Sequence, residues 1–359
     1  MAQIRRDTRL AQLTRSLEAV AQPRLLEAQI DVARAPQVAG ADSAVLSALQ
    51  FAIEIEIATL PPYFCALWSI KAGSGPVYRL IFNICLNEML HLGLACNMLT
   101  ALGGKPDIRS AYYTNISYPA HGLPDGVLPG LVVDLGSLTH DRVVNQFQVI
   151  ETPEHEIKST LRADDAPFTI GRFYDALATA LPAGGWTAGK PVTDGFITPQ
   201  ITSVTTAQAA IAKIKQQGEG TSALPYADGT TLAHFYTFEE IAQENRITGV
   251  TPGNPPQLIW AKPPDPALKM PECFVMKPID PGGRYLNPPA DVAANLQRFN
   301  VAWDKLLTDL DAAWVNDDLG TAVDDMTALK DAANTLFSAP PFDPAQPDLR
   351  YGPEFMRPL

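Results

Sequence analysis

An acidic side chain and an imidazole lie three residues apart in an apolar part of the sequence. Glu88 and His91 belong to the segment NEMLHLG, within a long apolar run from Val77 to Leu102. On a helix, residues three apart are separated by about 60° around the axis, so both side chains face the same neighbour. Burying an ionised carboxylate is costly unless it is paired or binds a metal, and Glu-x-x-His is half of a typical bundle metal site. The pair therefore indicates either a metal site or a buried polar pair without metal.

A second pair of polar residues lies in the preceding apolar segment. Glu56 and Tyr63 are seven residues apart, which places them two turns apart on one helical face. Glu54 lies about 200° from Glu56 around that helix, so at most one of these carboxylates faces the partner helix. Glu56 alone is also compatible with a salt bridge or a solvated edge. Glu-x6-Tyr on one helix, followed by Glu-x-x-His on the next, favours a shared metal site.

Apolar periods predict the helices that position these residues. Residues 43–71 predict one long helix, bent near Pro61 and Pro62, and a second helix is expected from 77 to 102, before the GGKP segment. The short GSGP loop between them predicts antiparallel packing. Further helices are expected within residues 140–154, 169–181, 205–220, 231–245, 290–314 and 322–337. Residues 107–140 and 249–289 are rich in proline and glycine. Because strand patterns are few and short, the fold class is mainly α.

Composition and charge narrow the classes of partner. The chain has 359 residues, with 27 Lys and Arg against 39 Asp and Glu and a net charge of -12, which argues against nucleic acid. No uninterrupted apolar run reaches the roughly 18 residues of a spanning helix, so no membrane association is expected. The four cysteines include no CxxC pair, which favours reduced thiols. A cytoplasmic protein is predicted.

The ordered series of motifs resembles a known family. Glu56-x6-Tyr63 and Glu88-x-x-His91 resemble the first half of the ferritin-like four-helix fold, in which carboxylates and histidines from four helices hold one or two metal ions. The segments LPGLVVDLGSL, FQVIETPE, TIGRFYDAL, QGEG and HFYTFEEI are similar to ferritin-like proteins grouped with the N-terminal part of the violacein-pathway iminophenyl-pyruvate dimer synthase. The likeness covers roughly residues 45 to 246.

The resemblance implies a set of metal ligands. They are Glu56 from the first helix, Glu88 and His91 from the second, Glu219 of QGEG and His234 of HFYTF. Tyr63 is then expected beside the metal, as a supporting residue or as a proton or radical donor.

One position departs from the pattern of the family. Arg172 of TIGRFY stands where the resemblance implies a glutamate. Arginine stays protonated and does not ligate metals, but its charge could replace a second cation or bind an acidic substrate. This substitution favours one metal ion over two.

The remaining histidines are not assigned to the site. His155 lies among Glu151, Glu154 and Glu156, a cluster that is more typical of a hydrated loop end. His121 and His140 have no supporting pattern around them.

The resemblance implies a ferritin-like four-helix bundle over residues 43–246. Residues 1–42 then form an N-terminal extension, and residues 247–359 form a proline-rich connection and extra C-terminal helices packed on the bundle. The function implied is oxidation of a small organic substrate by a non-haem metal enzyme in specialised metabolism, with iron as the metal and manganese or zinc as alternatives. The alternative is a non-catalytic bundle that binds a metal or a small molecule, its metal structural or lost. A homodimer is compatible with either reading, whereas the chain is too long for an iron-storage cage.

Overall fold

The computed structural model describes residues 43–153, 169–187, 192, 197, 199–220, 224–251, 257–316, 318–341, 343 and 345–359. The predicted N-terminal extension, residues 1–42, and the His155 cluster beyond Glu151 lie outside the described residues.

Two long, almost fully buried helices form the centre of the fold. They are α3 (Ser43–Trp68) and α4 (Pro76–Ala101), and they confirm the two helices predicted from the apolar periods. Thr59 of α3 contacts Glu88 of α4, whereas Glu56, earlier on α3, contacts His91, later on α4. Because a later residue of α3 contacts an earlier residue of α4 and the reverse, the two helices are antiparallel, as predicted. The α4 helix begins with proline at its first position, where the missing N–H costs no helical hydrogen bond.

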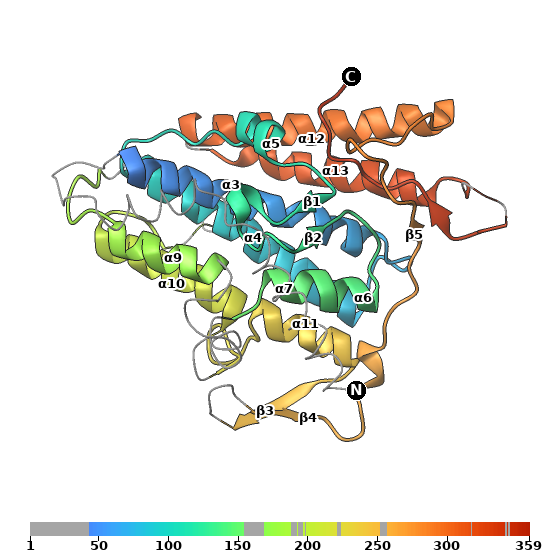
Figure 1. The fold of residues 1–359 in the computed structure, drawn as a ribbon, viewed down its shortest axis with the longest axis horizontal. Helices are drawn as coiled ribbons and strands as arrows, with labels where there is room; N and C mark the ends of the chain where they lie inside the picture. The colour runs from blue at the N-terminus through green and yellow to red at the C-terminus, as the bar shows by residue number, and fades with distance from the viewer. Residues whose placement is uncertain are drawn as a thin grey trace.

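Shorter helices cover one side of the α3–α4 pair (Figure 1). Two of them, α9 (Ile170–Ala180) and α10 (Val204–Glu219), pack against each other, and they contact α3 and α4 respectively. The others are α11 (His234–Gln243) and a continuous helical segment made of α6 (His140–Arg142), the π-helix η2 (Val143–Phe147) and α7 (Gln148–Ile150). The structure is the mainly helical, ferritin-like bundle that the resemblance implied.

The C-terminal helices lie on the opposite side of the α3–α4 pair (Figure 1). They are α12 (Ala290–Asn316) and α13 (Gly320–Ser338), which pack together and contact α4 and α3. Residues 107–140 are more ordered than the proline-rich sequence indicates, because they include α5 (Arg109–Asn115), which packs on α3 and α12. Two 3-10 turns, η1 (Pro124–Gly126) and η4 (Pro266–Leu268), lie in the long connections.

The strands are short and lie outside the bundle core. An antiparallel pair is formed by β1 (Ala120–His121) and β2 (Val132–Val133), and a second by β3 (Ile247–Thr251) and β4 (Gln257–Trp260). A parallel pair joins β5 (Val275–Met276) to β6 (Leu349–Arg350). This agrees with the few strand patterns in the sequence.

Helices α3 and α4 are each long and apolar enough to cross a membrane. However, 67% of the most apolar window of each helix is buried inside the protein. Such burial is typical of the core helices of a soluble protein, and the helices that cover them supply the apolar surroundings.

Helix α3 continues through Pro61 and Pro62. Proline lacks the N–H that would bond to the carbonyl four residues earlier, so Pro62 leaves the buried carbonyl of Ala58 without its helical partner. The hydroxyl of Tyr118 donates a hydrogen bond of 2.6 Å to that carbonyl. A residue from the irregular connection therefore restores the hydrogen bond that the proline removes.

Replacing Tyr118→Phe should lower the free energy of unfolding by about 1–3 kcal/mol, because it leaves a buried carbonyl unpaired. Urea unfolding followed by circular dichroism measures the change. Tyr78→Phe is the matched control, since the Tyr78 hydroxyl has no hydrogen bond among the described residues. Equal losses in the two variants would contradict the role given to Tyr118.

Candidate metal centre

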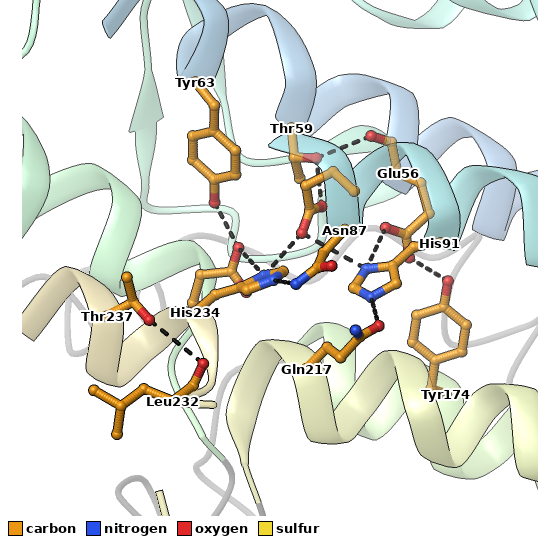
Figure 2. Close-up of polar contacts among 12 residues, drawn as sticks. Glu56, Thr59, Tyr63, Asn87, His91, Tyr174, Gln217, Leu232, His234 and Thr237 are labelled. Carbon is orange, nitrogen blue, oxygen red and sulfur yellow. Dashed lines mark hydrogen bonds and ion pairs between the residues drawn. The ribbon is translucent and has the colours of Figure 1, made fainter. Parts of the chain in front are cut away.

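Five buried side chains form two overlapping groups of metal-ligand type between the α3–α4 pair and the covering helices. The first group is Glu56, Glu88 and His91, and the second is Glu88, Glu151 and His234. Within each group, the potential ligand atoms lie within 4.8 Å of one another. All five residues are at most 7% exposed, so their charges are removed from water. Figure 2 shows Glu56 and Tyr63 from α3 above His91 and His234.

Glu88 is the carboxylate that the two groups share. Its Oε1 atom lies 3.6 Å from Nδ1 of His91 and 2.9 Å from Nδ1 of His234. The Oε2 atom of Glu56 lies 3.6 Å from the same His91 nitrogen, and Oε1 of Glu151 lies 3.6 Å from that of His234. Each imidazole therefore faces two carboxylates, and Glu88 lies between the imidazoles. Glu88 is therefore shared by two groups of side chains, each of which could hold a metal ion.

Each of the three carboxylates also accepts a hydrogen bond from a neutral hydroxyl group. Thr59 donates to Oε2 of Glu88 over 2.8 Å, and Tyr63 donates to Oε1 of Glu151 over 2.6 Å. Tyr174 of α9 donates to Oε1 of Glu56. These bonds fix the orientation of each carboxylate without adding a positive charge. For Glu56 and Glu88 the hydroxyl takes one oxygen, and the other oxygen faces the imidazoles.

The outer nitrogen of each imidazole also has a polar neighbour. The Nε2 of His91 lies 3.0 Å from Oε1 of Gln217, a pure acceptor, so this nitrogen carries the hydrogen. When the ring is neutral, as metal binding requires, the Nδ1 of His91 is therefore the nitrogen with the lone pair, on the side of Glu56 and Glu88. The side-chain amide nitrogen of Asn87, a donor, lies 3.2 Å from Nε2 of His234, so that ring also has a polar neighbour at its outer nitrogen, but one of the opposite kind (Figure 2). Metal-binding histidines are typically held by such outer partners.

The inner nitrogen of His234 gives an independent test of whether the residues fit a metal. This buried Nδ1 makes no well-directed hydrogen bond within the described part of the chain, although Glu88 lies 2.9 Å away. Buried polar nitrogens are normally paired. The carboxylate oxygens near this nitrogen do not lie along the direction in which its hydrogen or lone pair points. Such an arrangement is expected where a metal ion binds along that direction. The residues present therefore fit a metal.

Burial and mutual contact shift the pKa values of these groups in different directions. Burial raises the pKa of Glu56, and the neighbouring His91 only partly opposes this. For Glu88, contact with His234 and the charges of the two imidazoles outweigh burial and lower its pKa. Burial acts to lower the pKa of both histidines, but their carboxylate neighbours prevail, raising the pKa of His91 and bringing that of His234 to about 10. Without a metal, the two imidazolium charges compensate the buried carboxylates.

A cavity of about 30 Å³ lies beside Glu56, Glu88 and His91. Because one water needs about 10–15 Å³ of such volume, there is space for ions or a few waters. Glu219 of α10 lines this cavity but belongs to neither ligand group. Its carboxylate lies against Gly171, where an added Cβ would be 1.9 Å from Oε1 of Glu219, so only glycine permits this approach.

The structure brings together four of the five predicted ligands, namely Glu56, Glu88, His91 and His234. Glu219 lies at the cavity, and its role as a ligand stays a prediction. Tyr63 contacts the centre through Glu151. As predicted, Glu54 does not share the site with Glu56, because it accepts a hydrogen bond from Asn115 of α5.

Arg172 is half-buried and is not among the residues that line the cavity. Tyr174, about 200° further around α9, contacts Glu56 instead. The prediction that the Arg172 charge replaces a second cation therefore stays a prediction. The preference for one metal ion over two also stays a prediction, and the second group adds a further carboxylate, that of Glu151.

Glu151 is the residue that the sequence reasoning missed. The sequence pattern places it with His155 at a hydrated loop end, but it is 7% exposed and contacts both Tyr63 and His234. It directly follows the helical segment that contains the π-helix Val143–Phe147. A π turn changes the period within a helix, so a 3.6-residue pattern cannot be carried across it, and such turns are frequent at functional sites. The sequence signal that could have identified it is that Glu151 belongs to FQVIETPE, one of the segments on which the family resemblance rests.

Metal binding to this centre should strengthen as the pH rises. Because the raised pKa of His234, about 10, keeps this ring protonated near neutral pH in the metal-free protein, an ion must displace its proton. The affinity should rise about tenfold per pH unit for this proton, up to the His234 pKa of about 10. Calorimetry in buffers of different ionisation enthalpy counts the protons. Binding without proton release would contradict this assignment.

Gln217→Leu should weaken metal binding about 10- to 100-fold, because His91 loses the acceptor that fixes its tautomer. Competition with a chromophoric chelator measures the affinity. The adjacent and exposed Gln216→Leu is the matched control and should bind as the unaltered protein does. Equal affinities for the two variants would show that Gln217 does not orient His91.

Comparison with known proteins places these observations in a family. The ferritin-like family model matches residues 49–243, which include all five buried ligand-type residues. The crystal structure of a ferritin-like protein from Caulobacter vibrioides is similar, with a TM-score of 0.58 and 22% sequence identity over 84% of this chain and 96% of that chain. At this identity the likeness concerns the fold alone. A search of curated proteins gives no significant match. Since the family model covers more than half of the chain, the protein belongs to the ferritin-like family.

Proposed function

We propose that the protein binds two metal ions, Glu56 and His91 holding one, Glu151 and His234 the other, and Glu88 bridging them. The observation that carries this proposal is the double role of Glu88, whose Oε1 faces both imidazoles. Mixed carboxylate and imidazole ligands suit iron, with manganese and zinc as alternatives. Glu219, which lines the cavity, would supply an additional carboxylate ligand from the cavity side.

We further propose that the bound metal oxidises a small organic substrate in specialised metabolism. Iron bound here would supply oxidation chemistry with dioxygen. The protein's own side chains would exclude water and hold protons. Burial and the neighbouring carboxylates raise the pKa of Tyr63 far above its ordinary value. The phenol therefore stays protonated and donates a hydrogen bond to Glu151.

A second candidate function is a non-catalytic bundle in which the metal is structural. The cavity of about 30 Å³ favours this reading, since an organic substrate does not fit inside it. The oxidase proposal requires the substrate to approach where Lys215, Gly218 and Glu219 of α10 border the cavity. Lys215 is paired with Asp175 over 2.5 Å at this edge, which offers an ionic contact that an acidic substrate could replace.

Other expectations from the sequence remain proposals. They are the closer relationship to the violacein-pathway synthase, the cytoplasmic location, a homodimer, and the division at residues 42 and 246. The binding partner would be a small-molecule substrate, and neither nucleic acid nor a membrane. The net charge of -12 agrees with the exclusion of nucleic acid.

Elemental analysis after reconstitution with Fe(II) tests the metal proposal. The unaltered chain should hold about two ions, Glu151→Gln should hold one, and Glu88→Gln should lose both because it removes the shared ligand. Oxygen consumption during a substrate screen then separates an oxidase from a structural site.

Glu54→Gln is the matched control, since Glu54 is a buried carboxylate of α3 that bonds to Asn115 outside the centre. It should retain two ions. Circular dichroism of each variant establishes that the helices are intact. Full iron content in folded Glu88→Gln would remove the proposed bridge.

A further inference from the structure

A second and much larger cavity lies on the other side of the α3–α4 pair from the metal-ligand residues. Residues of α3, α4, α12 and α13 line it. Figure 1 shows the positions of these helices, with α12 and α13 above the α3–α4 pair. Its volume is about 580 Å³, against about 30 Å³ beside the ligands. Cavities of roughly 300–1,000 Å³ are typical of small-molecule sites. It is therefore large enough for an organic ligand.

The interior of this cavity is aromatic and aliphatic. Leu60, Phe64, Trp68, Trp303 and Leu306 line it, and each is nearly fully buried. A polar group placed among these side chains would lose its hydrogen bonds to water without replacement. The cavity therefore selects a ligand whose body is apolar.

The charged end of the cavity lies on α13. Lys330 is the one charged residue among the described residues of the lining, and Thr327, one turn before it, adds a hydroxyl. Both are exposed, which places them at the mouth. The Nζ atom of Lys330 lies 6.0 Å from the centre of the Tyr78 ring, and no carboxylate pairs with it in the described part of the chain. An unpaired cation beside an apolar cavity complements a ligand with one negative charge.

We propose that this cavity binds an apolar monocarboxylate, such as a fatty acid, with the chain between the four helices and the carboxylate at Lys330. One ammonium group at the mouth suits one carboxylate, whereas a phosphate would call for several donors. The inference does not depend on the proposed metal centre, since none of its five ligand residues lines this cavity.

Titration with decanoate and with 1-decanol tests the proposal on the full chain. Tryptophan fluorescence reports binding, because Trp68, Trp303 and Trp314 line the cavity and the chain has five tryptophans. Decanoate should bind saturably at one site per chain. Lys330→Met should weaken decanoate about two- to five-fold, as expected for one exposed ion pair, and leave decanol unchanged. Lys330→Glu should weaken decanoate further.

Lys269→Glu is the matched control, because it makes the same change in net charge at an exposed residue outside the cavity. Thr327→Phe, at the mouth, should hinder both probes. No saturable binding, or a decanoate affinity that is the same in Lys330→Glu and Lys269→Glu, would overturn the proposal.

A second copy of the chain is the competing occupant. Phe82 and Val323 line the cavity and are 41% and 58% exposed, so this face could instead join two chains. Sedimentation of the chain with and without decanoate distinguishes the two. A dimer that Phe82→Ser dissociates, and that excludes decanoate, would replace the ligand proposal with an interface.

Discussion

The burial of three carboxylates in one small volume is the constraint on which the centre of this protein depends. Glu56, Glu88 and Glu151 are each at most 7% exposed, and two imidazoles are the positive groups that contact them. Buried like charges are costly unless cations compensate them. The low pKa of Glu88 and the high pKa of His234 are two consequences of this compensation. A bound divalent ion would also compensate the carboxylate charges, and the imidazoles would then not need to be protonated.

The surrounding structure holds these charged groups in place with neutral partners. Hydroxyl groups from Thr59, Tyr63 and Tyr174 each orient one carboxylate. Each comes from a helix packed against the α3–α4 pair or from α3 itself. The centre is thus a property of the whole bundle, because the ligands and the groups that orient them come from separate helices. Tyr118 has a similar role for the backbone of α3, where it bonds to a carbonyl that proline leaves unpaired.

The α3–α4 pair separates two environments of opposite character. One face presents carboxylates and imidazoles in a cavity of about 30 Å³, and another presents aromatic side chains to a cavity of about 580 Å³ below α12 and α13. Both helices are therefore buried on almost all sides, which explains why they are apolar enough to resemble membrane spans. The C-terminal helices provide the cover for the second face.

The sequence by itself determined the two central helices, their antiparallel packing and the common direction of Glu88 and His91, because a regular helical period links spacing to direction. The choice of Glu56, Glu88, His91 and His234 as one ligand set came from the family resemblance of the sequence, since spacing alone does not join His234 to the others. It also determined that at most one of Glu54 and Glu56 could face the partner helix. Only the tertiary structure decided that Glu151 joins the centre, that Tyr174 contacts Glu56, and that Glu88 is shared. Glu151 follows a π-helical turn that breaks the period, and a shared ligand depends on the distance between helices remote in sequence. Spacing within one segment carries no information about either.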